Sequence, residues 1–480
     1  MALDETSQPL ELLLSVSRDG SRTLGAQIED QLRQTIRDGV LRPGAGVPST
    51  RDLARQLGVS RRVVVDAYAQ LGAEGYLSLR QGARPRVSDA AAVASETRAG
   101  AASAAPRARF DFRPSVPDVS TFPRAAWLRS LRHALATITD ADLGYGDPRG
   151  VEVLRCALAD YLGRVRGVVA DPEHIVVTNG YTQGLGVVCH ALAAAGAKRI
   201  ALEEASNPED GLVIARAGLE PVLIGVDESG TRVEELERAN ADAVVLTPAH
   251  QHPTGVVLTG ERRTALLAWL RASDTIAIED DYDAEYRYDR AAIGALQGLD
   301  PDRVIYAGSA SKTLAPALRI GWLVVPPSLL PAVIHEKLLA DRGTARIEQH
   351  ALADFLTRGE LDRHLRRMRT RYRDRRDALV DALTQALPEA TVLGAAAGLH
   401  VTVQLPASDN EPAIRAQAHD RRIELETMSD YRPTSRGHPP TLLLGYAQMP
   451  EPTIRAGVHE LAKAIRAART RGQGASAPPV

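Results

Sequence analysis

The chain of 480 residues is long enough for more than one domain with a large core. Its formal net charge is only −2, so any surface that binds nucleic acid must be local rather than a property of the whole chain. Its two cysteines exclude a disulfide framework, and the sequence contains neither a signal-peptide pattern nor a run of about 18 apolar residues. We therefore expect a cytoplasmic protein with no membrane contact.

Residues 20–87 combine helical periodicity with an excess of arginine. Apolar residues at every fourth position predict a helix over residues 22–39. A short capped helix from residue 48, a glycine turn and a second helix that begins after Ser60 describe a helix-turn-helix. Residues 75–87 are predicted to form the two short strands of a wing. The segment carries eleven arginines and six acidic residues, a local net charge of +5, which is typical of a surface that contacts DNA.

Four short motifs occur in this segment, LRPG at residues 41–44, VPSTR at 47–51, LGVSR at 57–61 and EGYL at 74–77. They resemble the winged helix of GntR-type regulators, and a valine at position 47 is the one departure. The resemblance implies a domain over residues 10–87 that binds operator DNA. It also implies the residues that contact DNA, which are Ser49, Thr50, Arg51, Ser60, Arg61, Arg62 and Tyr68 in the helices and Arg80 and Gly82 in the wing. The alternatives are a solvated surface for the arginines and packing against neighbouring side chains for Tyr68.

Beyond the wing, the sequence predicts a linker and a second, larger domain. Residues 88–109 are rich in small residues and lack an apolar stripe, which predicts an interdomain linker. Apolar strands then alternate with helix-length stretches, which predicts an α/β domain with a mainly parallel sheet. The predicted strands are residues 199–202, 221–224, 243–246, 275–278, 303–307 and 321–325.

The chain past residue 330 is predicted to be mainly helical. An arginine-rich helix over residues 360–373 is either a further DNA-contacting surface or a solvated helix that leads into a small domain. Short strands near residues 400–403 and 442–446 and a final helix over residues 453–469 predict a small α+β subdomain.

Lys312 stands out because the chain has only four lysines among 58 basic residues. A lysine can form an imine with an aldehyde, which a guanidinium cannot do. The hydroxyls of Ser309 and Ser311 and the guanidinium of Arg319 would suit a phosphate beside such an imine, which is the shape of pyridoxal 5'-phosphate (PLP). Taken alone, the motif is a weak signal and favours the alternative, a loop lysine exposed to solvent.

An apolar strand at residues 276–279 runs into a cluster of carboxylates, as active-site strands do in α/β sheets. Because side chains alternate along a strand, Asp280 and Tyr282 share one face and can reach the same ring. An aspartate beside a pyridinium nitrogen keeps it protonated, and a tyrosine can bond the ring's phenolate oxygen. A solvated acidic loop and a metal site are the alternatives. No histidine stands at a spacing that suits metal binding, so we expect no metal.

The sequence EDDYD at residues 279–283, followed by SASK at 309–312 and Arg319, resembles the MocR/GabR group of regulators, in which a GntR-type winged helix is fused to a fold-type I aminotransferase-like domain. The resemblance implies a multidomain protein whose residues 110–475 form a large α/β and a small α+β subdomain, bind PLP and assemble as a head-to-tail homodimer. It implies that Lys312 forms the Schiff base with PLP. The other implied cofactor contacts are Asp280, Tyr282, Gly180, Tyr181, Thr182, Ser309, Ser311, Arg319, His252 and the partner's Tyr145. A plain turn residue is the alternative for Tyr145 and for His252.

Two segments depart from that family near the expected cofactor. Asn179 and Tyr181 replace the small hydroxyl residues that relatives carry in the phosphate turn, although the backbone donors survive. Asn207 stands where relatives carry an aromatic residue that stacks on the PLP ring, and Glu209 adds negative charge nearby.

The C-terminal strand, residues 441–446, carries a third departure, which bears on function. It has a leucine where GABA-responsive relatives have an arginine, the side chain that binds a substrate carboxylate; Arg432 or Arg436 could substitute. We therefore expect a PLP-dependent DNA-binding transcription regulator that senses PLP or an amino compound through an imine at Lys312. The missing arginine favours PLP itself, as in PdxR-like members. The alternatives are a catalytically active aminotransferase that carries a DNA-binding module, and a regulator whose large domain has lost the cofactor.

Overall fold

The computed structural model describes residues 14–18, 22–80, 83–89, 108–288, 293–394, 396–432 and 438–474. The chain divides into two compact units, residues 1–106 and 107–480, and each is described by itself. Residues 90–107, which make up most of the predicted linker, and residues 10–13 at the start of the predicted DNA-binding domain lie outside the described residues.

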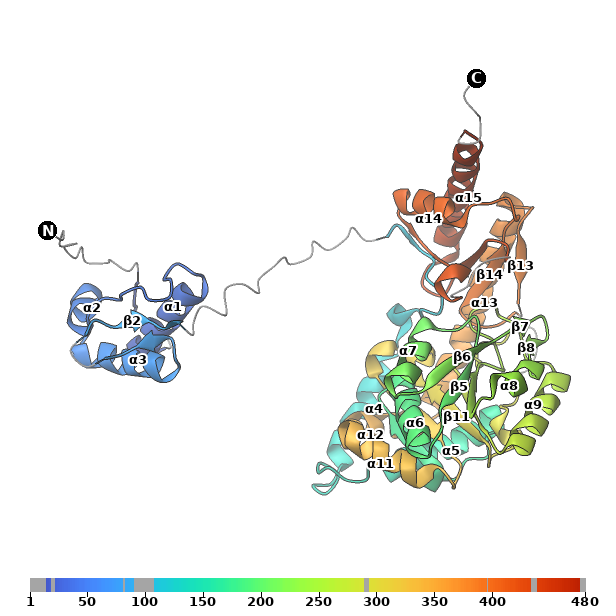
Figure 1. The fold of residues 1–480 in the computed structure, drawn as a ribbon, viewed down its shortest axis with the longest axis horizontal. Coiled ribbons are helices and arrows are strands. Elements are labelled where there is room, and N and C mark those ends of the chain that lie inside the picture. The colour runs from blue at the N-terminus through green and yellow to red at the C-terminus, as the bar shows by residue number, and fades with distance from the viewer. Residues whose placement is uncertain are drawn as a thin grey trace. The chain divides into compact units, whose positions relative to one another are not determined.

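The N-terminal unit holds a helix-turn-helix and a wing (Figure 1). The helix α2 (Thr50–Leu57) is capped by the side chain of Ser49, which accepts a hydrogen bond from the backbone N–H of Asp52. The helix ends at Gly58, whose φ of 63° is left-handed. The described elements are α1 (Leu24–Arg37), α2 (Thr50–Leu57), α3 (Arg61–Ala73) and the antiparallel strands β1 (Leu77–Ser78) and β2 (Arg86–Val87). The predicted winged helix-turn-helix is confirmed.

Tyr68 is a core residue, and the prediction that it contacts DNA is wrong. Its side chain is 2% exposed and belongs to the apolar cluster that also contains Val64 and Leu71 of α3. Its hydroxyl donates a hydrogen bond to the carbonyl oxygen of Pro48 at 2.9 Å. The spacing of four and three residues between these side chains places Tyr68 on the buried face of α3, opposite the face that can reach DNA.

Replacement of Tyr68 by phenylalanine is expected to destabilise the N-terminal unit without changing its affinity for operator DNA. The ring keeps its packing, but the buried carbonyl of Pro48 loses its donor, which should lower the free energy of unfolding by about 1–3 kcal/mol. Thermal unfolding and fluorescence anisotropy with an operator fragment measure the two quantities. A tenfold loss of affinity at a temperature where the variant is folded would contradict the core assignment.

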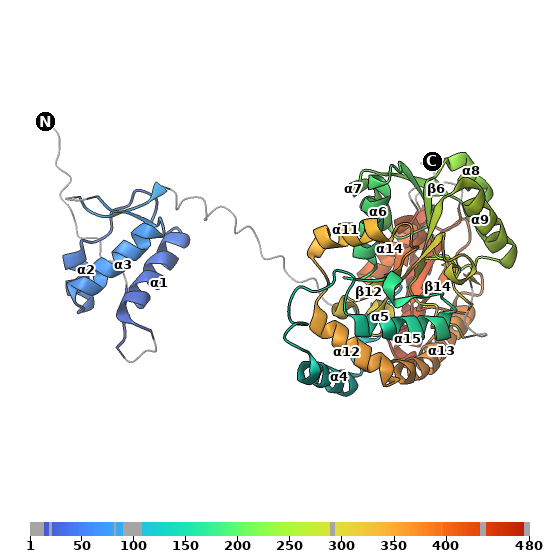
Figure 2. The same ribbon diagram turned by 90° about the horizontal axis from the view of Figure 1, so that it is seen from below.

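A seven-stranded sheet forms the centre of the C-terminal unit (Figure 2). Its strand order is β4-β12-β11-β10-β9-β5-β6, and β12 is antiparallel to both neighbours while the other pairs are parallel. The six strands predicted in this region occur with ends shifted by up to three residues, so the mainly parallel sheet is confirmed. In sheet order the strands are β4 (Ile175–Thr178), β12 (Gly321–Val324), β11 (Val304–Ser309), β10 (Ile276–Asp281), β9 (Ala243–Leu246), β5 (Arg199–Glu203) and β6 (Glu220–Ile224).

Helices cover both faces of this sheet, which explains why its strands are almost continuously apolar. Neighbouring residues of β9 point to opposite faces of the sheet, because Val245 belongs to one apolar cluster and Val244 to another. The first face is covered by α6 (Tyr181–Ala194), α7 (Pro208–Arg216) and α11 (Leu330–Asp341). The second is covered by α5 (Glu152–Arg166), α8 (Glu234–Ala239) and α9 (Gly260–Ser273), and α12 (Arg346–Thr357) packs on α5 and on α4 (Arg124–Thr137). A hairpin of β7 (Val226–Asp227) and β8 (Gly230–Thr231) completes the large subdomain.

The small α+β subdomain follows the long helix α13 (Glu360–Ala386). Its antiparallel sheet has the order β13-β14-β17-β16, and α14 (Glu411–Asp420) and α15 (Glu451–Gly474) pack together beside it. The strands are β13 (Thr391–Leu393), β14 (His400–Gln404), β17 (Thr441–Gly445) and β16 (Glu426–Thr427). The N-terminal strand β3 (Phe110–Asp111) pairs in parallel with β15 (Ile423–Glu424), which ties the start of this unit to its small subdomain.

In the part of the chain that the structure describes, no helix combines the length and the apolar character needed to span a lipid bilayer. The described residues also contain no group of three or more histidine, cysteine or acidic side chains placed to hold a metal ion.

Candidate functional site

Lys312 lies in a pocket at the carboxyl ends of two neighbouring parallel strands, where α/β sheets commonly place their ligand sites. Strands β10 and β11 run side by side, and Lys312 is on the short helix α10 (Ala310–Thr313) that directly follows β11. The pocket has a volume of about 340 Å³. It brings together most of the predicted PLP-binding residues, namely Tyr181, Thr182, His252, Asp280, Tyr282, Ser309, Ser311, Lys312 and Arg319.

The amine of Lys312 is available for reaction. Its side chain is half-buried, and no hydrogen-bond partner for it occurs among the described residues. Burial lowers its pKa, while the negative charges of Asp283, Asp280 and Glu426 act in the opposite direction. A lowered pKa increases the fraction of neutral amine, which is the form that attacks an aldehyde.

Asp280 and Tyr282 line the pocket at the end of β10. Burial raises the pKa of Asp280 well above its ordinary value, and the neighbouring carboxyl of Asp210 adds to the effect. A cation placed beside Asp280 would therefore stabilise its charged form. The hydroxyl of Tyr282 lies 3.0 Å from Nδ1 of His250, and this nitrogen lies 3.1 Å from Oδ1 of Asp283.

A backbone turn at the start of α6 offers donors to an anion. Gly180 has a φ of 84° and precedes Tyr181 and Thr182, the first residues of α6, both of which line the pocket. The free N–H groups at such a helix terminus attract anions. Nη2 of Arg319 donates to the carbonyl oxygen of Asn179 at 2.6 Å. A Cβ added at Gly180 would lie 2.9 Å from this guanidinium, so a glycine keeps the cradle open.

The residues that depart from the family pattern have structural partners. The hydroxyl of Tyr181 donates to Oδ2 of Asp210 at 3.2 Å, and burial raises the pKa of Asp210 to about 7. Asn207 lines the pocket and caps α7, and Glu209 also reaches the pocket. Asn207 thus caps a helix at the position where relatives carry the aromatic residue that stacks on the PLP ring.

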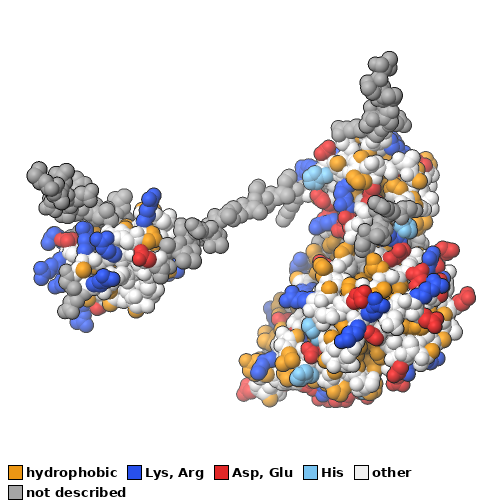
Figure 3. Space-filling view, viewed as in Figure 1, with side chains coloured by type: hydrophobic (Ala, Val, Ile, Leu, Met, Phe, Trp, Pro, Cys, Tyr) orange, Lys and Arg blue, Asp and Glu red, His pale blue; other side chains and the backbone are white. Residues whose placement is uncertain are grey.

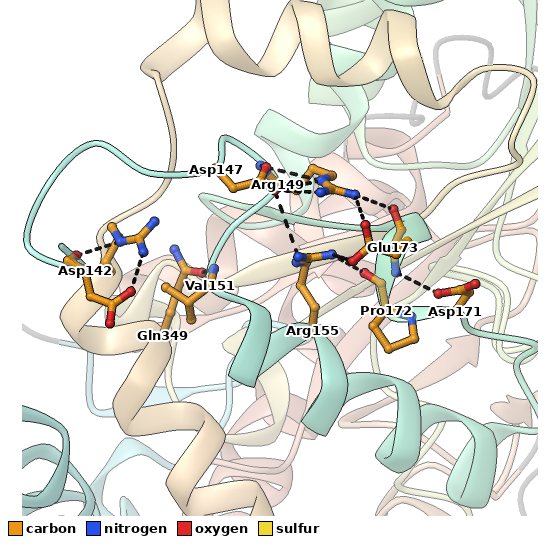
Figure 4. A network of polar contacts seen from close by, with 10 residues as sticks. Asp142, Asp147, Arg149, Val151, Arg155, Asp171, Pro172, Glu173 and Gln349 are labelled. Carbon is orange, nitrogen blue, oxygen red and sulfur yellow. Dashed lines mark hydrogen bonds and ion pairs between the residues drawn. The ribbon is translucent and has the colours of Figure 1, made fainter. Parts of the chain in front are cut away.

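Tyr145 does not line the pocket. Its side chain is 77% exposed, and its ring centre lies 5.4 Å from Cζ of Arg342. The loop that carries it is held on both sides, because Arg346 donates to the side chain of Asp142 at 2.9 Å, and Arg149, which pairs with Asp147, also pairs with Glu173 at 2.8 Å (Figure 4). Within one chain, therefore, the ring of Tyr145 is presented outwards from an ordered loop.

Two polar residues of the pocket have no counterpart in the sequence analysis. Ser115 has a left-handed φ of 58° and lines the pocket beside Pro114. Tyr431 reaches the pocket from the small subdomain, with its ring centre 5.1 Å from that of His252 and its hydroxyl bonded to Glu426. Neither follows a strand of the central sheet, so the strand-end pattern that identified Asp280 could not find them.

The described residues supply no carboxylate-binding arginine on the C-terminal strand. Leu443 of β17 is fully buried and packs against Ala205 and Met428. Arg432, the first predicted substitute, pairs with Glu204 at 3.0 Å and does not line the pocket of Lys312. Arg436, the second, lies outside the described residues.

The predicted DNA contacts gather at the start of the two helices of the helix-turn-helix. Ser60, Arg61 and Arg62 are exposed at the start of α3, and Arg51 is exposed on the first turn of α2. Nε of Arg61 lies 3.4 Å from Oγ1 of Thr50, so the start of α3 contacts the start of α2. Figure 3 shows basic side chains gathered on the N-terminal unit. Of the remaining predicted contacts, Ser49 is half-buried and engaged as a cap, Arg80 is exposed and Gly82 lies outside the described residues.

Both units match known families. Residues 24–87 match the bacterial regulatory proteins of the gntR family, and residues 117–428 match the aminotransferases of class I and II. The chain is 31% identical over 459 residues to the HTH-type pyridoxine biosynthesis transcriptional regulator PdxR of Corynebacterium glutamicum. This match covers 95% of this chain and 99% of the relative. It is 32% identical over 487 residues to the probable rhizopine catabolism regulatory protein MocR of Rhizobium meliloti, with 96% and 97% covered.

This chain is a MocR/GabR-type regulator. Its C-terminal unit also resembles the crystal structure of a multiple substrate aminotransferase from Thermococcus profundus, with a TM-score of 0.69 and 25% identity over 77% of this chain and 93% of that chain. The MocR/GabR-type regulator is thus a DNA-binding transcription regulator whose effector domain has the fold of a PLP-dependent aminotransferase, and its cofactor is PLP.

The pocket of this MocR/GabR-type regulator fits PLP. The amine of Lys312 has no partner among the described residues and suits an aldehyde, and a Cβ at Gly180 would crowd the guanidinium of Arg319, so the turn requires a glycine beside this cation. Nδ1 of His252 is buried without a partner, so a polar ligand atom could satisfy it. PLP would bring an aldehyde that condenses with amines and a pyridinium that withdraws electrons. Lys312 would hold it covalently, Asp280 would keep the pyridinium protonated, and Tyr282 would donate to the ring oxygen.

Replacement of Asp280 by asparagine in this MocR/GabR-type regulator should stabilise the PLP-free protein and weaken PLP binding. The folded-state pKa of Asp280 lies above its ordinary value of 3.8, so ionisation of Asp280 destabilises the fold as pH rises past about 4. The variant lacks this penalty, and its advantage in melting temperature should grow with pH. Loss of a charged hydrogen bond to the pyridinium should weaken PLP binding about 10- to 100-fold. Melting curves from pH 5 to 8 and PLP titrations measure both; a pH-independent difference in melting temperature would contradict the assignment.

Proposed function

We propose that the regulator binds operator DNA through the starts of α2 and α3 and that the occupancy of the Lys312 pocket by PLP sets its affinity for that DNA. The observation that carries the proposal is the set of groups around Lys312. An amine, a carboxyl, a phenol and an anion cradle surround one pocket of about 340 Å³ in a chain that also bears exposed arginines on a helix-turn-helix. The proposed phosphate contacts are Gly180, Tyr181, Thr182, Ser309, Ser311 and Arg319.

The regulator works as a cytoplasmic homodimer in this proposal, with the two chains arranged head to tail. Tyr145 then reaches the phosphate of the partner's cofactor, which accords with its 77% exposure on an ordered loop. A ligand changes DNA binding only if it has different affinities for two arrangements of the dimer. We assign that difference to PLP because its two ends engage separate elements, α10 at Lys312 and the start of α6.

PLP itself, rather than an α-amino acid, is the proposed effector. An amino-acid ligand needs a cation for its carboxylate, and Leu443 occupies the strand position where an arginine would serve. Among the described residues, Arg319 is the one arginine in the pocket, and its guanidinium lies at the phosphate turn. The similarity to a pyridoxine biosynthesis regulator supports the same ligand class.

Operator binding with and without PLP tests this function. The DNA upstream of the regulator's own gene, labelled with a fluorophore, serves as the probe. We expect PLP to shift the affinity of the wild-type protein and to have no effect on the Lys312→Ala variant. An unchanged response to PLP in Lys312→Ala would contradict the role of the covalent bond. Steady turnover of an amino donor with a keto acid would instead support the alternative, an active aminotransferase that carries a DNA-binding module.

A further inference from the structure

The fully buried Lys337 forms an ion pair with the partly exposed Asp341 near the end of α11. The Lys337 side chain is 0% exposed, and its Nζ lies 2.6 Å and 2.5 Å from the two carboxylate oxygens of Asp341. Nζ also donates to Oγ1 of Thr344 at 3.1 Å. Burial alone would raise the pKa of Asp341, but hydrogen bonds from Lys337 and Gln183 hold it below its ordinary value, so the carboxylate is charged. Taking the charge of Lys337 out of water is unfavourable, which suggests a role beyond packing.

The carboxylate of Asp341 fixes the turn that precedes α6. Its Oδ2 accepts hydrogen bonds from Nδ2 of Asn179 at 2.8 Å and from Nε2 of Gln183 at 2.6 Å. Oε1 of Gln183 accepts from the backbone N–H of Asn179 at 2.7 Å. The carbonyl of Asn179 accepts from Arg319. The turn that forms the phosphate cradle is therefore held by Asp341 through its side chains and by Arg319 through its backbone.

The same ion pair fixes the segment that supports Tyr145. The backbone N–H of Gly343 donates to Oδ1 of Asp341 at 2.8 Å, and Thr344 receives the hydrogen bond from Lys337. Between these anchors, Arg342 has a left-handed φ of 60° and places its guanidinium over the ring of Tyr145.

The next helix extends this support to the rest of the Tyr145 loop. In Figure 4, Gln349 of α12 accepts a hydrogen bond at 2.8 Å from the backbone N–H of Val151, where the loop ends. Arg346, one turn earlier, donates to the carbonyl of Asp142 at 2.7 Å, where the loop begins. One continuous stretch from α11 to α12 thus contacts the phosphate turn at one end and the Tyr145 loop at the other.

We propose that Lys337 and Asp341 are positioning residues that select the phosphate group of PLP and link the cofactor sites of the two subunits. This inference rests on the proposed function, in which Arg319 binds the phosphate in its own subunit and Tyr145 binds that of the partner's cofactor. Asp341 orients the cradle, and Lys337 neutralises a carboxylate that would otherwise repel a phosphate close by. Occupancy of one cradle and support for the other subunit's cofactor then depend on the same ion pair.

Pyridoxal, which lacks the phosphate, separates positioning from general stability. In Asp341→Asn, Lys337→Met and Asn179→Ala, we expect the affinity for PLP to fall about tenfold or more and the affinity for pyridoxal to stay unchanged. Asn179→Ala removes the side-chain contact with Asp341 and adds no new donor, so it still tests the proposal if the Lys337 variant does not fold. Lys463→Met makes the same chemical change at an exposed position and should alter neither affinity. Equal losses for PLP and pyridoxal, or no loss, in both Asp341→Asn and Asn179→Ala would overturn the proposal.

Mixed dimers test the link between subunits. A chain with Lys312→Ala and Asp341→Asn is paired with a wild-type chain through different affinity tags, so that PLP can attach only to the wild-type chain. We expect this pair to bind PLP more weakly than a pair in which the partner carries Lys312→Ala alone, because the altered partner supports its Tyr145 poorly. Equal affinities would overturn the link. Failure of the wild-type chain itself to bind PLP or to form a dimer would contradict the proposed function instead.

Discussion

Replacement of Lys312 by alanine is expected to abolish the covalent attachment of PLP. The wild-type protein incubated with PLP should absorb at roughly 400–430 nm, and borohydride should fix the cofactor to one lysine. The chain offers three other lysines, and none suits the reaction. Lys198 and Lys463 are exposed and outside the pocket, and Lys337 is buried in its ion pair. The variant should therefore show no such absorption.

Mass spectrometry of the reduced and digested protein measures this outcome directly. The adduct should occur on the peptide with Lys312 in the wild type and be absent from the variant. Lys198→Ala, which removes an exposed lysine, is the matched control and should retain the full adduct. An adduct of unchanged yield on another lysine of Lys312→Ala would show that the pocket does not direct the reaction.

Simultaneous replacement of Arg61 and Arg62 by alanine should cause the second large effect, a loss of operator affinity of roughly 100-fold or more. Both side chains are exposed at the start of α3, where a helix-turn-helix offers its residues to the major groove. Each lost phosphate contact should also lower the slope of log affinity against log salt by about 0.9. Anisotropy titrations at several salt concentrations measure the affinity and the slope together.

The control for this variant is Arg366→Ala with Arg373→Ala. It removes two exposed arginines from α13, the arginine-rich helix for which the sequence left DNA contact open. We expect little change in affinity or in salt slope. An equal loss in both double variants would show that the charge of the whole chain, and not the position of Arg61 and Arg62, determines binding.

The parts of this protein that could be predicted from sequence are those set by local periodicity. The inner parallel strands are buried on both faces, so each appears as a short apolar run, and the strands predicted on that basis are present. Functional side chains follow the ends of such strands, which is why Asp280 and Lys312 could be assigned to one site before their distance in space was known. Their proposed partner Arg319 follows by a fixed spacing within one motif.

The remainder depends on packing between distant segments. Tyr68 shares a helical stripe with Val64 and Leu71, and this periodicity was a better guide than the family motif that made it a DNA contact. Lys337 and Asp341 are four residues apart, a spacing that also describes an ordinary pair on a helix surface. Only the packing of α11 against the sheet buries Lys337 and brings Asp341 to Asn179. Tyr431 reaches the pocket from another subdomain, so no local pattern could reveal it.

The first described segment of the C-terminal unit connects the small subdomain to the pocket of Lys312. The backbone N–H of Phe112 donates to the carbonyl oxygen of Glu424, and the carbonyl of Phe112 accepts from the backbone N–H of Gly445. This segment is therefore hydrogen-bonded to the small subdomain. Two residues later, Pro114 and Ser115 form part of the wall around Lys312. A ligand in the pocket therefore contacts a segment whose backbone is hydrogen-bonded to the small subdomain. Ligand binding and the attachment of the small subdomain thus depend on the same few residues.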